Sequence, residues 1–515
     1  MNIKELFKEY LSTCVLAKRS AEVEKLFIGD SAVSSYMAFL NPEKLFDYDL
    51  ENWKHITNIF DITSSVIFKT QVLDVLYSNA KFIKRDKDDN QYYRTNAIKQ
   101  YYAFLKTLEF FNDKSSDNDL NDTAIHSFIN YNITSSYYRP YITAIKSKPF
   151  LLLAGISGTG KSRIVRELAR ACWDVDTEEY KAQKPKNYEM IQVKPNWHDS
   201  SELIGYVSRV SGKPEFIVGD FLKFIAKAWE NLEVPHFLCL DEMNLAPVEQ
   251  YFAEYLSVVE SRKNIDGEVV TDAIIEKCAE QWYFDLTAKL TTNEEVRTRF
   301  KNEGISIPKN LIVVGTVNMD ETTFSFSRKV LDRAMTIEMN EVDLDAGLTN
   351  RYEQIGKLGE AELIGDAVEG VDVYADNTVV CDRAIAYLKS INAVLEGTPF
   401  KVAYRTRNEF LLYVVNNLPY NKNEQGEEIE QGVVMARALD EITNMKILSR
   451  IEGDETKVSK RFLTELSTTI ANGLKEISGK EYASTDGEGA EFAVSLAKLE
   501  EMKKRLDSGY TSFWS

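Results

Sequence analysis

Three short apolar runs occur near the middle of the chain, at Phe150–Ala154, Phe237–Leu240 and Leu311–Val317. Continuous apolar runs of this length are typical of strands that are buried on both faces of a parallel sheet. After the first run, apolar residues recur at helical spacing, at Ile164, Val165, Leu168, Ala169 and Cys172. This alternation of strands and helices predicts an α/β core with a parallel sheet over about residues 140–345.

Helical patterns flank this core on both sides. On the N-terminal side, one apolar helix face is formed by Ala97, Ile98, Tyr101, Tyr102, Leu105 and Leu108. The polar stretch Asn112–Asp119 after it predicts a linker or loop. We therefore expect a mostly helical N-terminal domain over residues 1–135, a linker and helical lid over 346–480, and a C-terminal tail over 481–515. Within the core, residues 264–308 are expected to be an insertion formed by a hairpin or by helices.

The composition is that of an ordinary folded protein, with 44% hydrophobic and 28% charged residues among 515. Met1–Lys8 carries charges where a signal peptide would be apolar, and no apolar run approaches the ~20 residues of a membrane span. The five cysteines and four histidines are scattered, which favours a reducing compartment and argues against a zinc site. We expect a cytoplasmic protein that does not contact the membrane.

The formal net charge of −18 repels nucleic acid on average, so any contact with DNA requires a local basic face. One candidate face interleaves basic residues with tyrosines, namely Lys81, Lys84, Arg85, Lys87, Arg94, Lys99 and Lys106 with Tyr92, Tyr93, Tyr101 and Tyr102. These tyrosines and Trp53 are candidates for stacking on bases. The alternative is a solvated turn followed by an amphipathic helix, since Asp86, Asp88 and Asp89 interrupt the basic residues.

The clearest chemical motif follows the first apolar run. Gly155–Ser162 reads GISGTGKS and fits the pattern GxxxxGK(S/T) at every required position. Between a strand and a helix this pattern forms a phosphate site, because backbone N–H groups and the helix N-terminus converge on phosphate oxygens. The residues expected to hold a nucleoside triphosphate are Gly155, Ser157, Gly158, Thr159, Gly160, Lys161, Ser162 and Arg163. Lys161 is expected to reach the β- and γ-phosphates, and Ser162 to hold Mg²⁺.

Acidic and amide residues follow the other two apolar runs. Asp241 and Glu242 end the second run. Together with the phosphate loop, they predict a carboxylate that holds Mg²⁺ (Asp241) and a base that polarises the attacking water (Glu242). Asn318 ends the third run, where its amide can bind the attacking water or the γ-phosphate. The alternatives are that the two acids cap a helix and that Asn318 caps a turn.

Three arginines are candidates for a further role at the phosphates. Arg333 is a candidate arginine finger, a guanidinium from one subunit that completes the phosphate site of its neighbour. A surface salt bridge is the alternative for Arg333. Arg405 and Arg407 begin a helical stretch of the lid, and either can reach back to the phosphates. The sequence does not distinguish between these two.

The order of these motifs resembles that of AAA+ ATPases: a phosphate loop, an Asp-Glu strand, a polar sensor strand, a Leu-Asp-Arg segment and a helical lid. More narrowly, Trp197–Tyr206, Leu240–Glu249, Gly315–Thr323 and Met445–Ile451 are similar to the McrB-like branch, the motor subunits of modified-cytosine-dependent restriction systems. The resemblance covers roughly residues 140–460.

This resemblance implies a homo-oligomeric ring, usually a hexamer, with nucleotide at the subunit interfaces. It also implies a McrC-like nuclease partner that stimulates hydrolysis. In this branch the N-terminal domain recognises the target, often modified DNA, so residues 1–135 are expected to bind DNA or a partner. McrB uses GTP, and its sensor segment has an arginine that Val317–Thr323 lacks. We therefore expect ATP, with GTP as the alternative.

Two functions remain for such a motor. One is to drive a DNA-cleaving partner in a defence system, because the chain carries no recognisable nuclease motif of its own. The other is that of a MoxR-like ATPase that remodels proteins, which the acidic charge suits. A scaffold that binds nucleotide without turnover is disfavoured by the intact Lys161, Asp241, Glu242 and Asn318.

Overall fold

The computed structural model describes Tyr101 and residues 137–175, 177–265, 267–319, 324–340, 355–422, 428–485 and 489–514. The chain divides into two compact units, and nearly all described residues belong to the unit formed by Tyr137–Asn421 and Glu428–Ser515. In the other unit, Tyr101 is helical and fully buried, so its ring is not exposed for stacking on a base. The remaining basic and aromatic candidates of the N-terminal domain lie outside the described residues.

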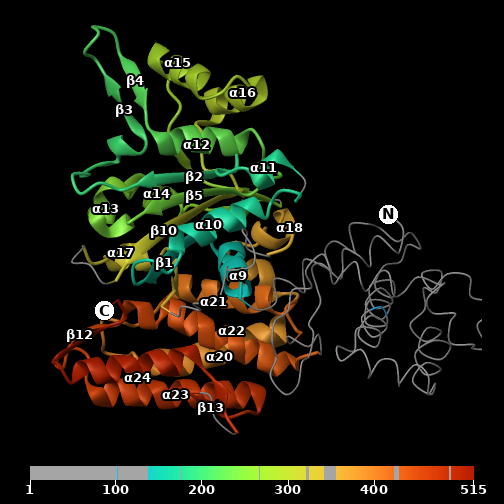
Figure 1. Ribbon diagram of the computed structural model, residues 1–515, viewed down its shortest axis with the longest axis vertical. Coiled ribbons are helices and arrows are strands. Elements are labelled where there is room, and N and C mark those ends of the chain that lie inside the picture. Colours follow the sequence, from blue (N-terminus) through green and yellow to red (C-terminus); the bar gives the residue numbers. More distant parts are fainter. Residues whose placement is uncertain are drawn as a thin grey trace, which may run out of the picture. The chain divides into compact units, whose positions relative to one another are not determined.

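A five-stranded parallel sheet forms the centre of the described unit, in the order β11-β1-β10-β5-β2 (Figure 1). Its strands are β1 (Phe150–Gly155), β2 (Tyr188–Gln192), β5 (His236–Asp241), β10 (Leu311–Asn318) and β11 (Met335–Glu338). All of β1 is buried, and so is β10 up to its last residue, as the apolar runs predict. The predicted α/β class with a parallel sheet is confirmed.

Helices cover both faces of this sheet. On one face, α10 (Lys161–Arg170) packs against β1, β5 and β10, and α9 (Arg139–Ser147) packs against β1 and β11. The core of the other face includes residues of α12 (Asp220–Trp229), α13 (Val248–Tyr251) and α14 (Ala253–Val258). Its aromatic centre is formed by Phe150, Phe221, Phe252 and Tyr255, with ring centroids 4.4 to 6.1 Å apart.

The helical segment that follows the Asp-Glu pair is broken in two. The apolar pattern indicates one continuous helix from Val248 to Val259, but Phe252 has φ −115° and ψ 16° and separates α13 from α14. Its ring stacks on Tyr255 at 4.4 Å and also contacts Phe150. The ring of Phe252 thus packs on the sheet at the position where the backbone departs from helical geometry.

One hairpin and two helices extend from the sheet at the end opposite the C-terminal helices (Figure 1). This hairpin pairs β3 (Gly205–Ser208) with β4 (Glu215–Val218) and follows η5 (Ser200–Glu202). The segment 264–308 is bounded by β6 (Lys263–Ile265) and contains β7 (Glu268–Val270), β8 (Ala273–Ile275), α15 (Gln281–Leu290), α16 (Glu294–Glu303) and β9 (Ile305–Ser306). It therefore holds both a hairpin strand and helices. The short helices α11 (Glu178–Lys181), η6 (Met243–Leu245) and α17 (Arg328–Leu331) complete this part.

A helical domain follows the sheet. Its elements are α18 (Glu360–Leu363), α19 (Gly370–Tyr374), α20 (Thr378–Val394), α21 (Tyr404–Asn417), α22 (Gln431–Lys446), η7 (Leu448–Arg450), β12 (Glu452–Asp454), α23 (Lys460–Ser478), β13 (Tyr482–Ala483), β14 (Glu491–Phe492), α24 (Val494–Leu506) and β15 (Tyr510–Ser512). Because α24 packs against α22 and α23, the described residues after 481 are part of this domain and do not extend from it as a tail. Near the C-terminus, Trp514 contacts both parts of the unit: its Nε1 donates to Ser449 O of the helical domain at 2.8 Å, and its ring contacts Phe326, which follows β10.

None of the helices in the described ranges combines the length and the apolar character that crossing a membrane requires.

Candidate nucleotide-binding site

The carboxyl ends of the parallel strands bring distant polar residues to one edge of the sheet. β1 ends at Gly155, which pairs with Asn318 at the end of β10. The next strand, β5, ends at Asp241, and Glu242 follows it. The connection from β1 leads to the edge strand β2, and the chain then returns through β5 and β10. The last strand, β11, lies on the other side of β1, so the connections leave in opposite directions at this point of the sheet. Open α/β sheets bind ligands at such a point, outside the carboxyl ends of the strands.

The loop between β1 and α10 has a backbone that glycine permits. Gly158 and Gly160 have φ values of 87° and 84°, and a Cβ atom at either position would meet nothing within 4 Å. Backbone conformation therefore favours glycine at both positions, and open space adjoins the loop. α10 begins directly after Gly160, and the backbone N–H groups at a helix N-terminus point towards the preceding loop.

Lys161 folds back against the loop. Its Nζ donates to Gly155 O at 2.9 Å and to Ile156 O at 2.7 Å, and the residue is 6% exposed. Thr159 Oγ1 donates to the same carbonyl of Ile156 at 3.1 Å. A positive charge is thereby held at the centre of the loop.

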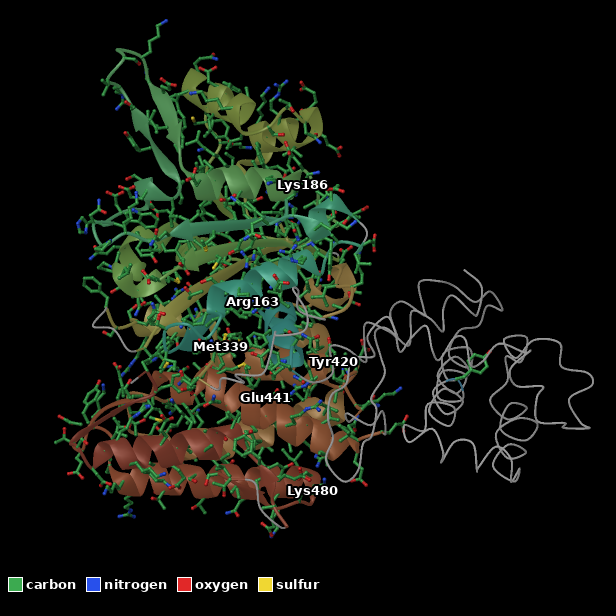
Figure 2. All side chains as sticks on the ribbon, viewed as in Figure 1. Arg163, Lys186, Met339, Tyr420, Glu441 and Lys480 are labelled. Atoms are coloured by element: carbon green, nitrogen blue, oxygen red, sulfur yellow. The ribbon has the colours of Figure 1, made fainter. Side chains whose placement is uncertain are left out.

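The segment after β11 supports the loop from the side. Asn340 Oδ1 accepts a hydrogen bond from Ile156 N at 3.0 Å, and Met339 N donates to Ala154 O at 2.7 Å. Met339, labelled in Figure 2, comes so close that a Cβ on Gly155 would lie 2.5 Å from its carbonyl oxygen. The first glycine of the motif is therefore required by close backbone packing.

Ser162 and Asp241 lie side by side. Ser162 Oγ donates to Asp241 Oδ1 at 2.5 Å, which joins the first turn of α10 to the end of β5. The same Oδ1 accepts a second hydrogen bond from Thr316 Oγ1 at 2.9 Å. Thr316 was not identified from the sequence, although it is a polar residue in an apolar strand and shares a strand face with Asn318.

Glu242 has an unusual backbone conformation. Its φ of 53° and ψ of 52° lie in the left-handed region, and among the described residues it is the one non-glycine residue with positive φ. Such a conformation costs about 1–2 kcal/mol for a residue that carries a Cβ. Two contacts hold it: Glu242 N donates to Thr316 Oγ1 at 3.0 Å, and Asn318 Nδ2 donates to Glu242 Oε1 at 3.2 Å. The structure thus brings Glu242 and Asn318 together.

Close packing behind Glu242 fixes the path of the chain. The next residue, Met243, lies over Gly315 of β10, where a Cβ would approach its Sδ to 2.3 Å. Tyr251 Oη donates to Met243 O at 2.7 Å. The missing side chain at Gly315 makes room for the turn that directs Glu242.

A magnesium nucleotide fits these groups. Mg²⁺ takes oxygen ligands from side chains and phosphates while keeping several waters, and Ser162 Oγ and Asp241 Oδ1 present two such oxygens at adjacent positions. The loop adds backbone donors, the Lys161 ammonium and open space beside Gly158 and Gly160. Arg163, labelled in Figure 2, lies on α10 with its side chain exposed.

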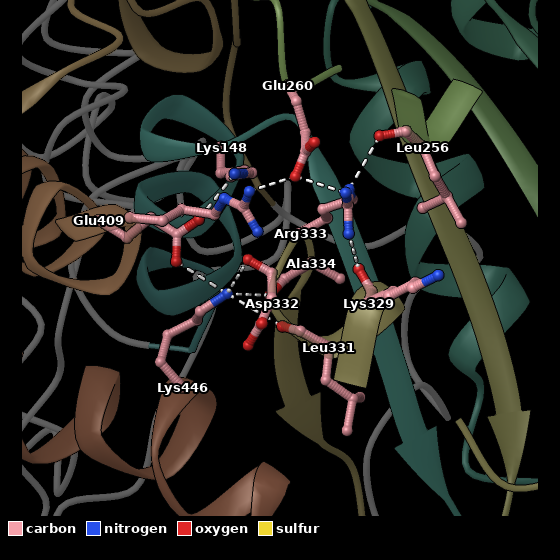
Figure 3. Close-up of polar contacts among 11 residues, drawn as sticks. Lys148, Leu256, Glu260, Lys329, Leu331, Asp332, Arg333, Ala334, Glu409 and Lys446 are labelled. Atoms are coloured by element: carbon pink, nitrogen blue, oxygen red, sulfur yellow. Dashed lines mark hydrogen bonds and ion pairs between the residues drawn. The ribbon is translucent and has the colours of Figure 1, made fainter. Parts of the chain in front are cut away.

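Two of the three candidate arginines converge on one carboxylate (Figure 3). Glu260 Oε1 pairs with Arg333 at 2.5 Å and also with Arg405 of the helical domain. Arg333 donates further to Leu256 O at 2.8 Å and to Lys329 O at 2.5 Å. Within the described residues, these contacts hold Arg333 in its own subunit and not at the loop 155–162. No sequence pattern points to Glu260 as the shared partner.

Arg407 does not join this cluster. Its guanidinium lies over the Tyr404 ring and donates to Asn408 Oδ1 at 2.8 Å. Of the two lid arginines, Arg405 is therefore the one that contacts the α/β part of the unit, and it does so through Glu260.

A second polar cluster lies between the sheet and the helical domain (Figure 3). Lys446 of α22 is fully buried and donates to three backbone carbonyls, Leu331 O at 3.1 Å, Asp332 O at 3.1 Å and Ala334 O at 2.7 Å. Its counter-charge is Glu409 Oε2 of α21, at 2.8 Å. Burial lowers the pKa of Lys446 to about 8, against the opposing effect of Glu409.

Glu409 links this cluster to the start of β1. Its Oε1 accepts a hydrogen bond from Lys148 Nζ at 2.7 Å, and Lys148 lies just before Phe150. Burial alone would raise the pKa of Glu409, but Lys148 and Lys446 together hold it below its usual value. The carboxylate therefore remains ionised between two lysines.

Comparison with known proteins adds one domain assignment. The model of a family described as a domain of unknown function (DUF8727) matches residues 364–510. This segment corresponds to the helical domain from α19 to β15 and contains Arg405, Glu409 and Lys446. No curated protein matches the chain. The match defines a helical domain similar to DUF8727 without assigning it an activity.

Proposed function

We propose that the chain is a nucleoside-triphosphatase of the AAA+ class. The observation that carries this proposal is the Ser162–Asp241 contact of 2.5 Å at the sheet edge where Asn318 also meets Glu242. A phosphate loop, two adjacent magnesium-binding oxygens and a second carboxylate beside an amide are the parts that hydrolysis of a phosphoanhydride needs.

Each residue has a distinct task in this mechanism. The loop N–H groups and Lys161 bind the β- and γ-phosphates, which requires Lys161 to exchange its carbonyl partners for phosphate oxygens. Ser162 and Asp241 would hold Mg²⁺, which would supply positive charge beside the phosphates. Glu242 accepts the proton of the attacking water, and Asn318 orients that carboxylate. We assign ATP as the nucleotide, with GTP as the competitor to be tested.

The assembly is a ring of identical subunits, in which Arg333 serves the site of a neighbour. Its Nη1 and Nη2 atoms each use one N–H in the contacts described, which leaves N–H groups for a further acceptor. The similarity to McrB-like motors supports a DNA nuclease as the partner, with residues 1–135 as the recognition domain. The net charge of −18 instead favours a protein client, as for a MoxR-like ATPase.

The Lys161→Ala variant tests the proposed site. It removes the cation of the loop, and because hydrogen bonds to charged groups contribute about 1.5–3 kcal/mol each, the Kd for Mg-ATP is expected to rise by roughly a hundredfold. Lys480→Ala, an exposed lysine of the helical domain that pairs with Glu491, is the matched control and should bind as wild type does. Equilibrium titration measures both. Tight binding by Lys161→Ala would place the phosphate site elsewhere, and tenfold more efficient turnover of GTP than of ATP would reverse the nucleotide assignment.

A further inference from the structure

The ammonium group of Lys446 contacts one turn at three points. Its Nζ donates to the carbonyls of Leu331, Asp332 and Ala334. These three residues flank Arg333 on both sides. Glu409 Oε2 is a fourth acceptor beside the same ammonium group, at 2.8 Å, so the three N–H bonds are shared between the turn and this carboxylate.

Burying the charges of Lys446 and Glu409 between the sheet and the helical domain has a desolvation cost. Taking an ion pair out of water costs several kcal/mol per ion, and apolar residues of similar volume often stabilise a protein equally well or better. A methionine would fill the position of Lys446 without that cost, but it would remove the donor that binds the carbonyls of Leu331, Asp332 and Ala334. The charge is therefore better explained by the geometry that it imposes than by the stability that it contributes.

A second contact from the helical domain reaches the same turn. Arg450 of η7 pairs with Asp332 Oδ1 at 3.1 Å, so both the backbone and the side chain of the turn are held by residues of the segment that follows α21. Arg333 itself points from this turn to Glu260, which also pairs with Arg405 (Figure 3). The orientation of the Arg333 guanidinium thus depends on how the helical domain holds its backbone.

We propose that Lys446 is a positioning residue for Arg333: it holds the turn Leu331–Ala334 from the helical domain and so sets where the guanidinium is presented. This inference rests on the proposed function, in which Arg333 stabilises charge on the transferred phosphoryl group. Lys446 touches no nucleotide in this arrangement and acts through the turn alone.

The test is a double variant, Glu409→Gln with Lys446→Met, in which neither residue of the buried pair is charged. Lys148, the other partner of Glu409, keeps its charge, and the glutamine amide oxygen remains as an acceptor for it. The expected result is a fall in kcat of on the order of 10- to 100-fold, the effect of displacing a reacting group, with the Kd for ATP within about twofold of wild type. In an Arg333→Ala background the same double substitution should cause no further fall in kcat, because the guanidinium that Lys446 positions is absent. If the two losses in kcat instead multiply, Lys446 does not act through Arg333, and the inference is overturned.

The matched control is Arg139→Met with Glu441→Gln. This buried pair joins α9 to α22, at 2.5 Å, much as Glu409 and Lys446 join α21 to α22, but neither Arg139 nor Glu441 contacts the turn 331–334 among the described contacts. It should lower the unfolding temperature and leave kcat within about twofold. An equal loss of kcat in this control would mean that general loosening of the domain, and not the turn, is responsible.

A second variant covers the case in which the neutral pair does not fold, as circular dichroism would report. Lys446→Arg keeps the charge opposite Glu409, but its planar fork cannot direct three N–H bonds at the same three carbonyls. It should also lower kcat at unchanged Kd, and wild-type turnover would overturn the inference. If the wild-type protein hydrolyses no nucleotide, the proposed function is overturned as well. If the wild-type protein hydrolyses ATP and the Lys446 variants have the same kcat, the inference alone is overturned.

Discussion

Glu242 combines an unusual backbone conformation with a hydrogen-bonded carboxylate. Its backbone is in the left-handed region, and its carboxylate accepts a hydrogen bond from Asn318. Strained non-glycine residues persist only where the surrounding structure over-determines them, and they cluster at functional sites. The conformation therefore supports a role for Glu242 beyond that of capping the short helix η6 that follows it.

The variant Glu242→Gln tests that role. Glutamine keeps the size and hydrogen-bonding capacity of the side chain but cannot accept a proton from water. We expect the Kd for ATP to stay near that of wild type and hydrolysis to fall by about 10²–10⁴-fold, the usual contribution of a general base. Single-turnover kinetics separates binding from hydrolysis in this variant. Normal turnover would reduce Glu242 to a structural element of the turn.

At the residue scale, the sequence predicted the members of the site better than their partners. The motif residues Ser162, Asp241 and Asn318 could be identified because each follows an apolar run or a glycine-rich loop. Thr316 stands out in the sequence as one polar residue inside the apolar strand β10, but its partners Asp241 and Glu242 come from another segment. Asn340, which follows β11, has no pattern around it that points to the loop. The pairing of Arg333 with Glu260 depends on tertiary contacts between segments far apart in the sequence.

At the scale of single elements, burial explains which strands were predictable. β1, β5 and β10 lie inside the sheet and appear as continuous apolar runs. The edge strand β2 has an alternating pattern of exposure, and β11 has only 4 residues, so neither stands out from its surroundings. The break between α13 and α14 was missed because its cause is the packing of Phe252 on neighbouring rings.

The conformation of the turn after β5 requires the space that Gly315 of the neighbouring strand β10 leaves for Met243. In Gly315→Ala the new Cβ would lie 2.3 Å from Met243 Sδ, and overpacking of this kind costs about 1–3 kcal/mol. Combining it with Met243→Ala should recover part of that loss, so the two changes should be less than additive in the free energy of unfolding, measured by urea denaturation. Met335→Ala, on β11, is the control and should add to Gly315→Ala without coupling. Additivity with Met243→Ala would contradict the proposed contact.

At the scale of the whole molecule, the position of Arg333 leads to a test of assembly. Arg333→Ala should leave the subunit able to bind nucleotide and lower hydrolysis by roughly 10³-fold or more, as when a guanidinium supplied in trans is lost. In mixed rings of Arg333→Ala and Lys161→Ala subunits, some interfaces combine an intact loop with an intact arginine. Those interfaces should recover activity that neither parent has, measured as turnover against mixing ratio.

A mixture of two variants that both damage the subunit's own site is the control for this experiment. Lys161→Ala and Glu242→Gln both damage the site of the subunit that carries them, so no interface in their mixed ring is intact and no recovery is expected. If mass measurement finds mixed rings of the first kind that stay inactive at every ratio, Arg333 is not a finger, and its pairing with Glu260 is its role.

The left-handed conformation of Glu242 also bears on how this protein would evolve under selection. Glycine adopts this backbone without the strain of about 1–2 kcal/mol, and its own entropic cost of roughly 0.5–1 kcal/mol offsets only part of that relief, so selection for heat resistance alone would favour Glu242→Gly while removing the carboxylate. Stability and activity oppose each other at this position. A library screened only for soluble, heat-resistant protein would drift towards inactive members, and lineages that retain glutamate there record continued selection for what the carboxylate does.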